Sequence, residues 1–170
     1  MGYTHYFRQH RSLSQPEWQG VINAFAKLLR NLPEHSMSAG GYYKEVPLVI
    51  RGLTGTCEPI INDRYIAFNG DEGTLSGLES MEHESMVLNR IKDAEDEDSR
   101  WFCKSARKPY DLVVCALLIV VANIATDAYK MGSDGGPEDW EPSLAWVNEV
   151  LGEHWRLPKS IAAQKNPIAA

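Results

Sequence analysis

The segment 100–110 concentrates residue types that bind anions. It reads Arg-Trp-Phe-Cys-Lys-Ser-Ala-Arg-Lys-Pro-Tyr, with four cations and no acid, and leads into an apolar run at 112–122 that predicts a buried helix. The start of a helix offers unpaired N–H groups and the positive end of the helix dipole. Cationic and hydroxyl side chains at that point predict a cradle for phosphate or carboxylate. The side chains that would form it are Lys104, Ser105, Arg107 and Lys108.

Aromatic side chains in and near this segment could stack on a base, which would make the ligand a nucleotide. The stacking candidates are Tyr6, Trp101, Phe102 and Tyr110, and the candidates for hydrogen bonds are His5 and Asn69. No glycine-rich phosphate loop accompanies the cations. A second interpretation therefore stays open, in which the cations face water or neutralise the acidic run at 93–98, itself expected to be a solvated loop.

Cys103 is the residue of this segment that could act as a nucleophile. A neighbouring lysine and a following helix would lower the pKa of its thiol, and His5 or His83 could serve as the base. The alternative is a buried Cys103 that fills space behind Trp101 and Phe102. Catalysis ranks last, because no complete set of nucleophile, base and orienting group can be identified in the sequence.

The histidines and cysteines predict neither a metal site nor a cofactor. His83 stands between Glu82 and Glu84, but no His-x-His or His-Glu-x-x-His pattern accompanies it. The cysteines number three and form no Cys-x-x-Cys pair, which argues against a disulfide scaffold and against a thiolate zinc site. This cysteine usage predicts a reducing, cytoplasmic setting.

Composition describes an acidic chain of one domain's length. The 170 residues include 17 Lys and Arg against 23 Asp and Glu, which gives a net charge of -6 at pH 7. That balance argues against direct binding to duplex nucleic acid and to anionic membranes. The first ten residues lack the apolar centre of a secretory signal, and the apolar run at 112–122 is shorter than the roughly 20 residues of a membrane span.

Residue periodicity predicts short strands separated by longer helices. The predicted strands are 2–8, 46–51, 65–68, 84–89 and 128–133, and the predicted helices are 14–32, 109–127 and 137–151. Most strand connections are too short for parallel crossovers. We therefore predict an α+β fold, with a small, mainly antiparallel sheet and about three helices packed on it. It forms one globular domain over 1–152, and 153–170 form a tail that is flexible unless it docks on a partner.

Several short blocks resemble a functionally unassigned family of phage and prophage proteins. They are Met1-Gly2-Tyr3-Thr4-His5-Tyr6-Phe7, where the family has Trp in place of Phe7, and then Phe68-Asn69-Gly70, His83-Glu84, Phe102-Cys103-Lys104 and Lys108-Pro109-Tyr110-Asp111. The resemblance covers 1–152 in scattered blocks. It implies a phage origin. It also implies that one surface holds His5, Asn69, His83, Lys104, Lys108 and Asp111.

Three functions follow as hypotheses. The first is a phage accessory protein, in a counter-defence role by analogy, that binds a nucleotide or other phosphate-bearing ligand at the basic helix start. The second is an acidic protein-protein inhibitor of a host defence system, such as an anti-CRISPR, favoured by the net charge and by the acidic run at 93–98. The third is a small enzyme with a cysteine nucleophile. An oligomer is compatible with each of them.

Overall fold

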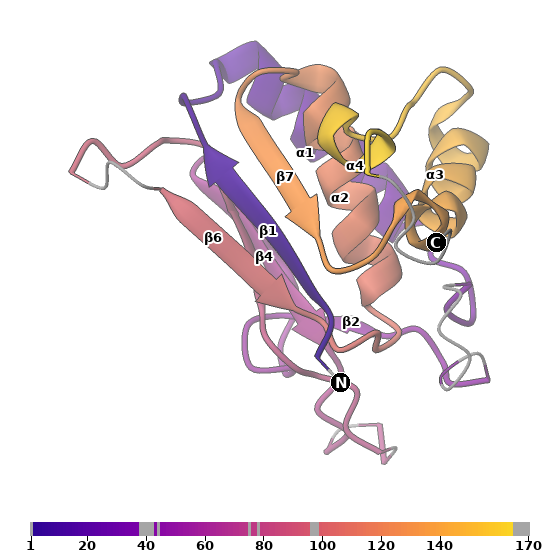
Figure 1. The fold of residues 1–170 in the computed structure, drawn as a ribbon. Helices are drawn as coiled ribbons and strands as arrows, with labels where there is room; N and C mark the ends of the chain where they lie inside the picture. The colour runs from indigo at the N-terminus through magenta and orange to yellow at the C-terminus, as the bar shows by residue number, and fades with distance from the viewer. Residues whose placement is uncertain are drawn as a thin grey trace.

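Figure 1 shows the fold in a computed structural model, which describes residues 2–37, 43, 45–74, 76–77, 79–95 and 99–164. The helices are α1 (Gln15–Leu29), α2 (Asp111–Ile124), α3 (Pro137–Leu151) and α4 (Lys159–Ala162). The strands are β1 (Thr4–Gln9), β2 (Ile50–Arg51), β3 (Ile60–Ile61), β4 (Tyr65–Gly70), β5 (Met86–Asn89), β6 (Arg100–Lys104) and β7 (Tyr129–Ser133). The loop predicted at 93–98 is described only at 93–95, which are exposed; 96–98 lie outside the described residues.

The strands form two antiparallel sheets. One has the order β6-β1-β7, and in the other β4 pairs with β2, β3 and β5. The predicted α+β class is confirmed by this mixture of helices and antiparallel ladders. Each predicted strand differs from the observed one at one end or both, and two of the differences are the most informative. Only Ile50–Arg51 of the segment 46–51 joins a ladder, and Asn69-Gly70, predicted to stop the preceding strand, are its last two residues.

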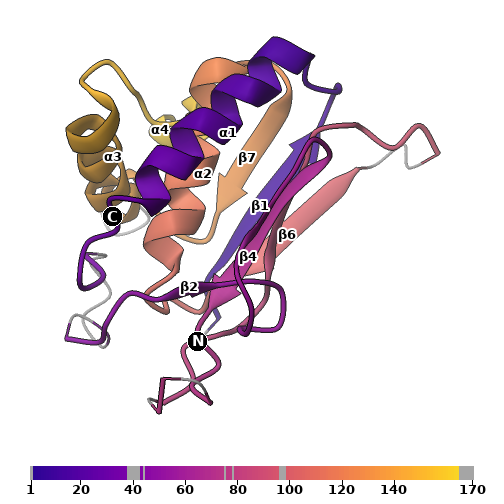
Figure 2. The same cartoon turned by 180° about the vertical axis from the view of Figure 1, so that it is seen from behind.

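Helix α2 lies at the centre of the core. Every residue from Asp111 to Val121 is buried, as expected of a helix that is apolar on almost all sides. Helices α1 and α3 both contact it, and Figure 2, seen from behind, shows α1 in front of α2. The helix is shorter than predicted at both ends, because Tyr110 is its N-cap and Ala125 its C-cap. Within the described residues, no helix has both the length and the apolar character that crossing a bilayer requires.

Helix α1 begins where the sequence predicts it to. The Ser14 N–H donates to Glu17 Oε2 (2.8 Å), and the Glu17 N–H donates to Ser14 Oγ (3.4 Å), which are the two bonds of a capping box. Its buried residues are Trp18, Val21, Phe25 and Leu28. The Phe25 ring lies 5.3 Å from the ring of Phe68 on β4, so α1 connects the second sheet to the helical core.

The sheet β6-β1-β7 has one covered and one open face. In Figure 1, α1 and α2 lie behind this sheet, and no described helix or strand crosses in front of β1 and β6. Burial alternates along β1: His5 and Phe7 are buried, whereas Tyr6 and Arg8 are exposed. One strand therefore supplies side chains both to the core and to an open surface.

Two segments fold differently from the prediction. Residues 100–104 of the basic segment form β6, rather than a loop that leads straight into the central helix. Residues 153–164 of the expected tail include α4, whose Ile161 is buried against the core. Residues 165–170 of that tail lie outside the described residues.

Candidate functional site

A buried polar cluster lies under β1 where the strand passes the start of α2. We call His5, Ser105, Asp111 and Cys115 the inner cluster. His5 Nε2 lies 2.7 Å from Asp111 Oδ1, the Ser105 hydroxyl donates to the same oxygen, and Cys115 Sγ lies 3.6 Å from His5 Nε2. None of these residues is more than 3 % exposed. The cluster thus connects β1, the turn before α2, and two residues of α2 that lie one helical turn apart on the same face.

Asp111 lies at the start of α2, where an external phosphate or carboxylate was predicted to bind. It is the first residue of α2, where a carboxylate complements the positive end of the helix dipole. It also accepts hydrogen bonds from the His5 ring and the Ser105 hydroxyl. The helix start thus already holds a carboxylate of the chain itself, which disfavours a phosphate at this point.

The turn between β6 and α2 directs the predicted cations away from one another. Ala106 and Arg107 have φ of 52° and 59°, a left-handed conformation that is uncommon outside glycine. The Arg107 guanidinium donates to Asp139 Oδ1 (2.7 Å) and lies 3.9 Å from the centre of the Tyr3 ring. Lys108 Nζ instead donates to the carbonyl oxygens of Ser80 (3.1 Å) and Glu82 (2.9 Å). Arg107 therefore bonds to α3, and Lys108 bonds to the segment 80–82.

The remaining predicted ligand-binding residues near this turn also bond within the chain. The buried Tyr110 hydroxyl donates to the Glu84 carbonyl (2.7 Å). The Asn69 side chain donates to the His83 carbonyl (3.0 Å) and accepts from the His83 N–H (3.1 Å). Of the residues that the phage resemblance would place on one surface, His5 and Asp111 thus form one bonded group and Asn69 and His83 another. The Lys104 side chain runs beside Gly2.

The geometry opposes nucleophilic catalysis at either buried thiol. Cys103 is fully buried, donates to the Glu84 carbonyl (3.4 Å), and has its pKa raised by burial. Burial likewise raises the pKa of Cys115. Asp111 and Cys115 both approach Nε2 of His5, whereas a catalytic relay places the carboxylate and the nucleophile on opposite ring nitrogens.

The same inner cluster also supplies ligand types that metals use. One atom each of His5, Asp111 and Cys115 lies within 4.8 Å of the others. Metal binding would require the Cys115 thiolate, which burial disfavours, and would compete with the bond between His5 and Asp111. The arrangement is best explained as a structural network that is bonded at Nε2 of His5, whereas the buried Nδ1 of the same ring has no hydrogen-bond partner among the described residues.

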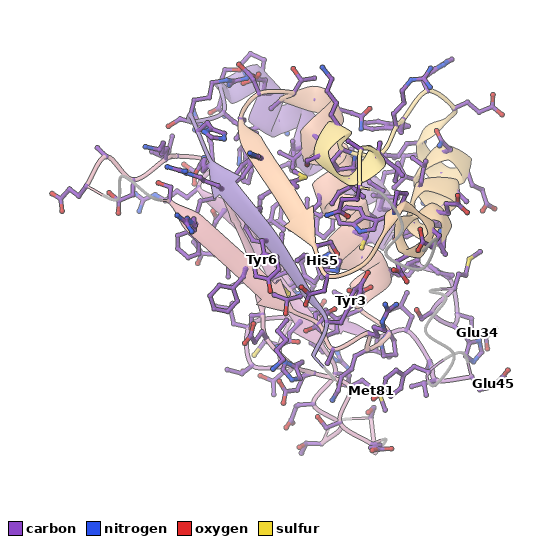
Figure 3. All side chains as sticks on the ribbon, viewed as in Figure 1. Tyr3, His5, Tyr6, Glu34, Glu45 and Met81 are labelled. Atoms are coloured by element: carbon purple, nitrogen blue, oxygen red, sulfur yellow. The ribbon has the colours of Figure 1, made fainter. Side chains whose placement is uncertain are left out.

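A second candidate site lies on the open side of the same strands. We call Tyr6, Arg8, Arg100, Phe102 and Lys130 the outer face. The antiparallel register sets Tyr6 opposite Phe102 and Arg8 opposite Arg100 on one side, and Arg8 opposite Lys130 on the other. Tyr6 is 47 % exposed and Phe102 61 % exposed. Figure 3 labels Tyr6 on β1, next to His5 along the same strand.

The outer face encloses a shallow hollow of about 310 Å³ beside Gly132. Gly132 faces Tyr6 across the ladder, and a Cβ added there would meet only Tyr6 Cβ at 4.0 Å, so the space above it is open. No acidic residue lines the hollow. Arg8 and Arg100 each interact with another group of the chain, so a ligand would share these guanidinium groups.

Trp101, which the sequence analysis groups with Tyr6, points to the other side of β6. It pairs in register with Phe7, whose side chain is buried. It lines the hollow beside Gly132 and also a neighbouring hollow that includes Glu84, Ser85 and Val87. Of the four predicted stacking candidates, the register therefore sets Tyr6 and Phe102 opposite each other.

Comparison with family models, curated proteins and solved structures found no match to this chain. The site is therefore interpreted from its own geometry.

Three cations of the outer face have no assigned role in the sequence analysis: Arg8, Arg100 and Lys130. Strand alternation is the signal that finds them. With 100–104 read as a strand, Arg100 and Phe102 fall on one side and Trp101 and Cys103 on the other. The tyrosine and arginine at alternate positions of β1 follow the same rule.

Proposed function

We propose that the protein binds a nucleotide-bearing ligand by stacking its base on the outer face. The observation that carries the proposal is the register pair of exposed Tyr6 and Phe102, flanked by Arg8, Arg100 and Lys130. Aromatic rings on an open sheet stack on bases of any sequence, and neighbouring cations attract their phosphates.

The packing of the two aromatic rings supports this assignment. Among the described residues, neither Tyr6 nor Phe102 packs against another aromatic ring, so their faces are available to a base. The open space above Gly132 provides room for a flat group beside Tyr6. The hollow has a mainly apolar surface, and its lining includes three cations and no acid. That combination suits a base and its phosphate in a chain whose net charge is -6.

This proposal keeps the ligand class of the first hypothesis and moves its site from the helix start to the sheet. In a phage accessory role, such a face would capture a nucleotide used as a host defence signal. The competing hypothesis is a protein-protein inhibitor, because tyrosine and arginine are also frequent in protein interfaces. The two hypotheses differ in whether isolated nucleotides bind.

Calorimetry with a panel of mono-, di- and cyclic nucleotides tests the proposal. We expect Tyr6→Ala and Phe102→Ala each to weaken binding by about 5- to 150-fold, since stacking on one aromatic ring contributes about 1–3 kcal/mol per base. Lys130→Ala should weaken binding less and reduce its dependence on salt. The matched controls are Leu53→Ala, another exposed apolar side chain, and Lys27→Ala, an exposed lysine of α1.

Two results would overturn the proposal. One is wild-type protein that binds no nucleotide at millimolar concentration. The other is nucleotide binding that Tyr6→Ala and Phe102→Ala leave unchanged. A host protein captured by the wild type and lost in both variants, without nucleotide binding, would support the inhibitor hypothesis instead.

A further inference from the structure

A second concave surface lies beside the outer face, at the far edge of β7. We call it the C-terminal cavity. It measures about 420 Å³ and is formed by the ends of α2 and β7 together with the segment that leads into α4. Its polar lining includes His10, Asn123, Asp127, Lys130, Arg156 and Lys159.

The C-terminal cavity carries positive charge that no described residue neutralises. Within the described residues, the side chains of Lys130, Arg156 and Lys159 have no hydrogen bond or ion pair, and all three residues are exposed. The acid of the lining, Asp127, accepts a hydrogen bond from Arg11 Nε (3.0 Å). A surplus of unpaired cations in a concavity of an acidic protein favours an anionic ligand.

The segment that brings these cations into place is anchored to the core. The Asn123 side chain donates to the Arg156 carbonyl (2.8 Å) and accepts from the Arg156 N–H (3.1 Å). Ile161 of α4 is fully buried two residues after Lys159. These contacts fix the backbone of both cationic residues and leave their side chains on the surface.

The two concave surfaces adjoin at one residue. Lys130 lines both the hollow of the outer face and the C-terminal cavity. A ligand whose base stacks on Tyr6 would therefore have its phosphate near Lys130. Further phosphates of the same strand would reach Arg156 and Lys159.

From this shared residue we infer that the ligand is a single-stranded oligonucleotide, which crosses from the outer face over Lys130 into the C-terminal cavity. The inference rests on the proposed function and deepens it. A mononucleotide would use only the first surface. A continuous strand would use the aromatic rings for its bases and the cations of the C-terminal cavity for its phosphodiester backbone.

Fluorescence anisotropy with labelled homopyrimidine strands of increasing length, alongside calorimetry with the mononucleotide, tests this inference. We expect affinity to rise with length until the strand spans both surfaces. The double variant Arg156→Ala/Lys159→Ala should weaken binding of the long strand and leave binding of the mononucleotide unchanged. Each lost phosphate contact should lower the slope of log affinity against log salt by about 0.7, or about 1.4 for the pair.

The matched control removes the same two residue types from the last turn of α1 and its C-cap, as Lys27→Ala/Arg30→Ala, both of which are exposed. It should leave the affinity for the long strand and its salt slope close to those of the wild type. Mononucleotide binding without any gain from length, or an unchanged salt slope in the Arg156/Lys159 variant, would overturn the inference and leave the proposed function standing. Absence of binding to strands and mononucleotides alike would overturn both.

Discussion

The two faces of the sheet β6-β1-β7 use polar residues in opposite ways. On the covered face, His5 and Asp111 are buried and bonded to each other. On the open face, Tyr6 and Phe102 expose large apolar rings among cations. Adjacent residues of one strand are thus a buried histidine and an exposed tyrosine, the reverse of what residue polarity alone would suggest.

Burial and exposure on the two faces separate structural residues from candidate binding residues. A buried polar group with all its partners inside the chain contributes to folding. An exposed aromatic pair contributes little to folding and is retained more naturally for binding. We therefore expect substitutions on the covered face to change stability, and substitutions on the outer face to change binding with little effect on stability.

The largest effect is expected for Asp111→Ala. Removing this carboxylate leaves the His5 ring and the Ser105 hydroxyl buried without their partner, which should lower the free energy of unfolding by about 3–5 kcal/mol. Urea denaturation followed by circular dichroism measures the change. Tyr6→Ala is the matched variant on the open face, and it should lose less than about 1 kcal/mol.

Equal losses of stability in Asp111→Ala and Tyr6→Ala would contradict the assignment of a structural role to the covered face alone. Where Asp111→Ala is too unstable to purify, Ser105→Ala provides a milder test. It removes one hydrogen bond to the same carboxylate, and we expect a loss of about 1–2 kcal/mol.

Thiol reactivity distinguishes exposed from buried residues in the unsubstituted protein. Cys57 is exposed, whereas Cys103 and Cys115 are fully buried and have their pKa values raised by burial. At neutral pH, a thiol reagent should modify Cys57 rapidly and the two buried thiols at least about a hundredfold more slowly, because the thiolate is the reactive form. Mass spectrometry of the labelled protein identifies the sites.

Rapid modification of Cys103 in the folded protein would contradict this assignment and revive the hypothesis of a cysteine nucleophile. Denaturation in urea is the control, since unfolding should make all three thiols reactive at similar rates.

Much of the fold was predictable from local patterns. The capping box at Ser14 and Glu17 and the uniformly apolar run after Asp111 identify α1 and α2, because both signals act within a few residues. The sequence analysis missed β3, whose two residues are too few to show periodicity, and β6, whose mixture of cations and aromatics resembles a surface loop. Short edge strands depend on tertiary pairing, which local patterns do not contain.

The candidate site was less predictable than the fold. Tyr6 was a predicted stacking residue and is exposed, but the sequence offers no means to choose between Trp101 and Phe102 without the register that sets Phe102 opposite Tyr6. Arg107 and Lys108 were predicted to hold one phosphate together. The left-handed turn instead directs Arg107 to Asp139 and Lys108 to the Ser80 and Glu82 carbonyls. These choices depend on contacts between residues far apart in the chain.

The smallest effect on stability is expected for Glu17→Gln. This change alters the partly exposed ion pair of Arg11 and Glu17, in contrast to the buried pair of His5 and Asp111. Arg11 donates two hydrogen bonds to the Glu17 carboxylate and holds the pKa of Glu17 at about 2, below the usual 4.5. Because this folded-state pKa is lowered, the pair stabilises the protein fully above about pH 4.5 and loses its effect as the pH falls towards 2.

Both side chains of that pair are partly in contact with water, at 38 % for Arg11 and 24 % for Glu17, so solvent screening reduces the contribution well below that of a buried pair. We expect Glu17→Gln to lower the free energy of unfolding by about 0.5–1 kcal/mol at pH 7, and less in 1 M salt. The difference between variant and wild type should shrink between pH 4.5 and 2, measured by urea denaturation across that range. A loss of unfolding free energy at pH 7 as large as that of Asp111→Ala would contradict this expectation. The exposed pair of Arg11 and Glu17 would then stabilise the fold as strongly as the buried pair of His5 and Asp111.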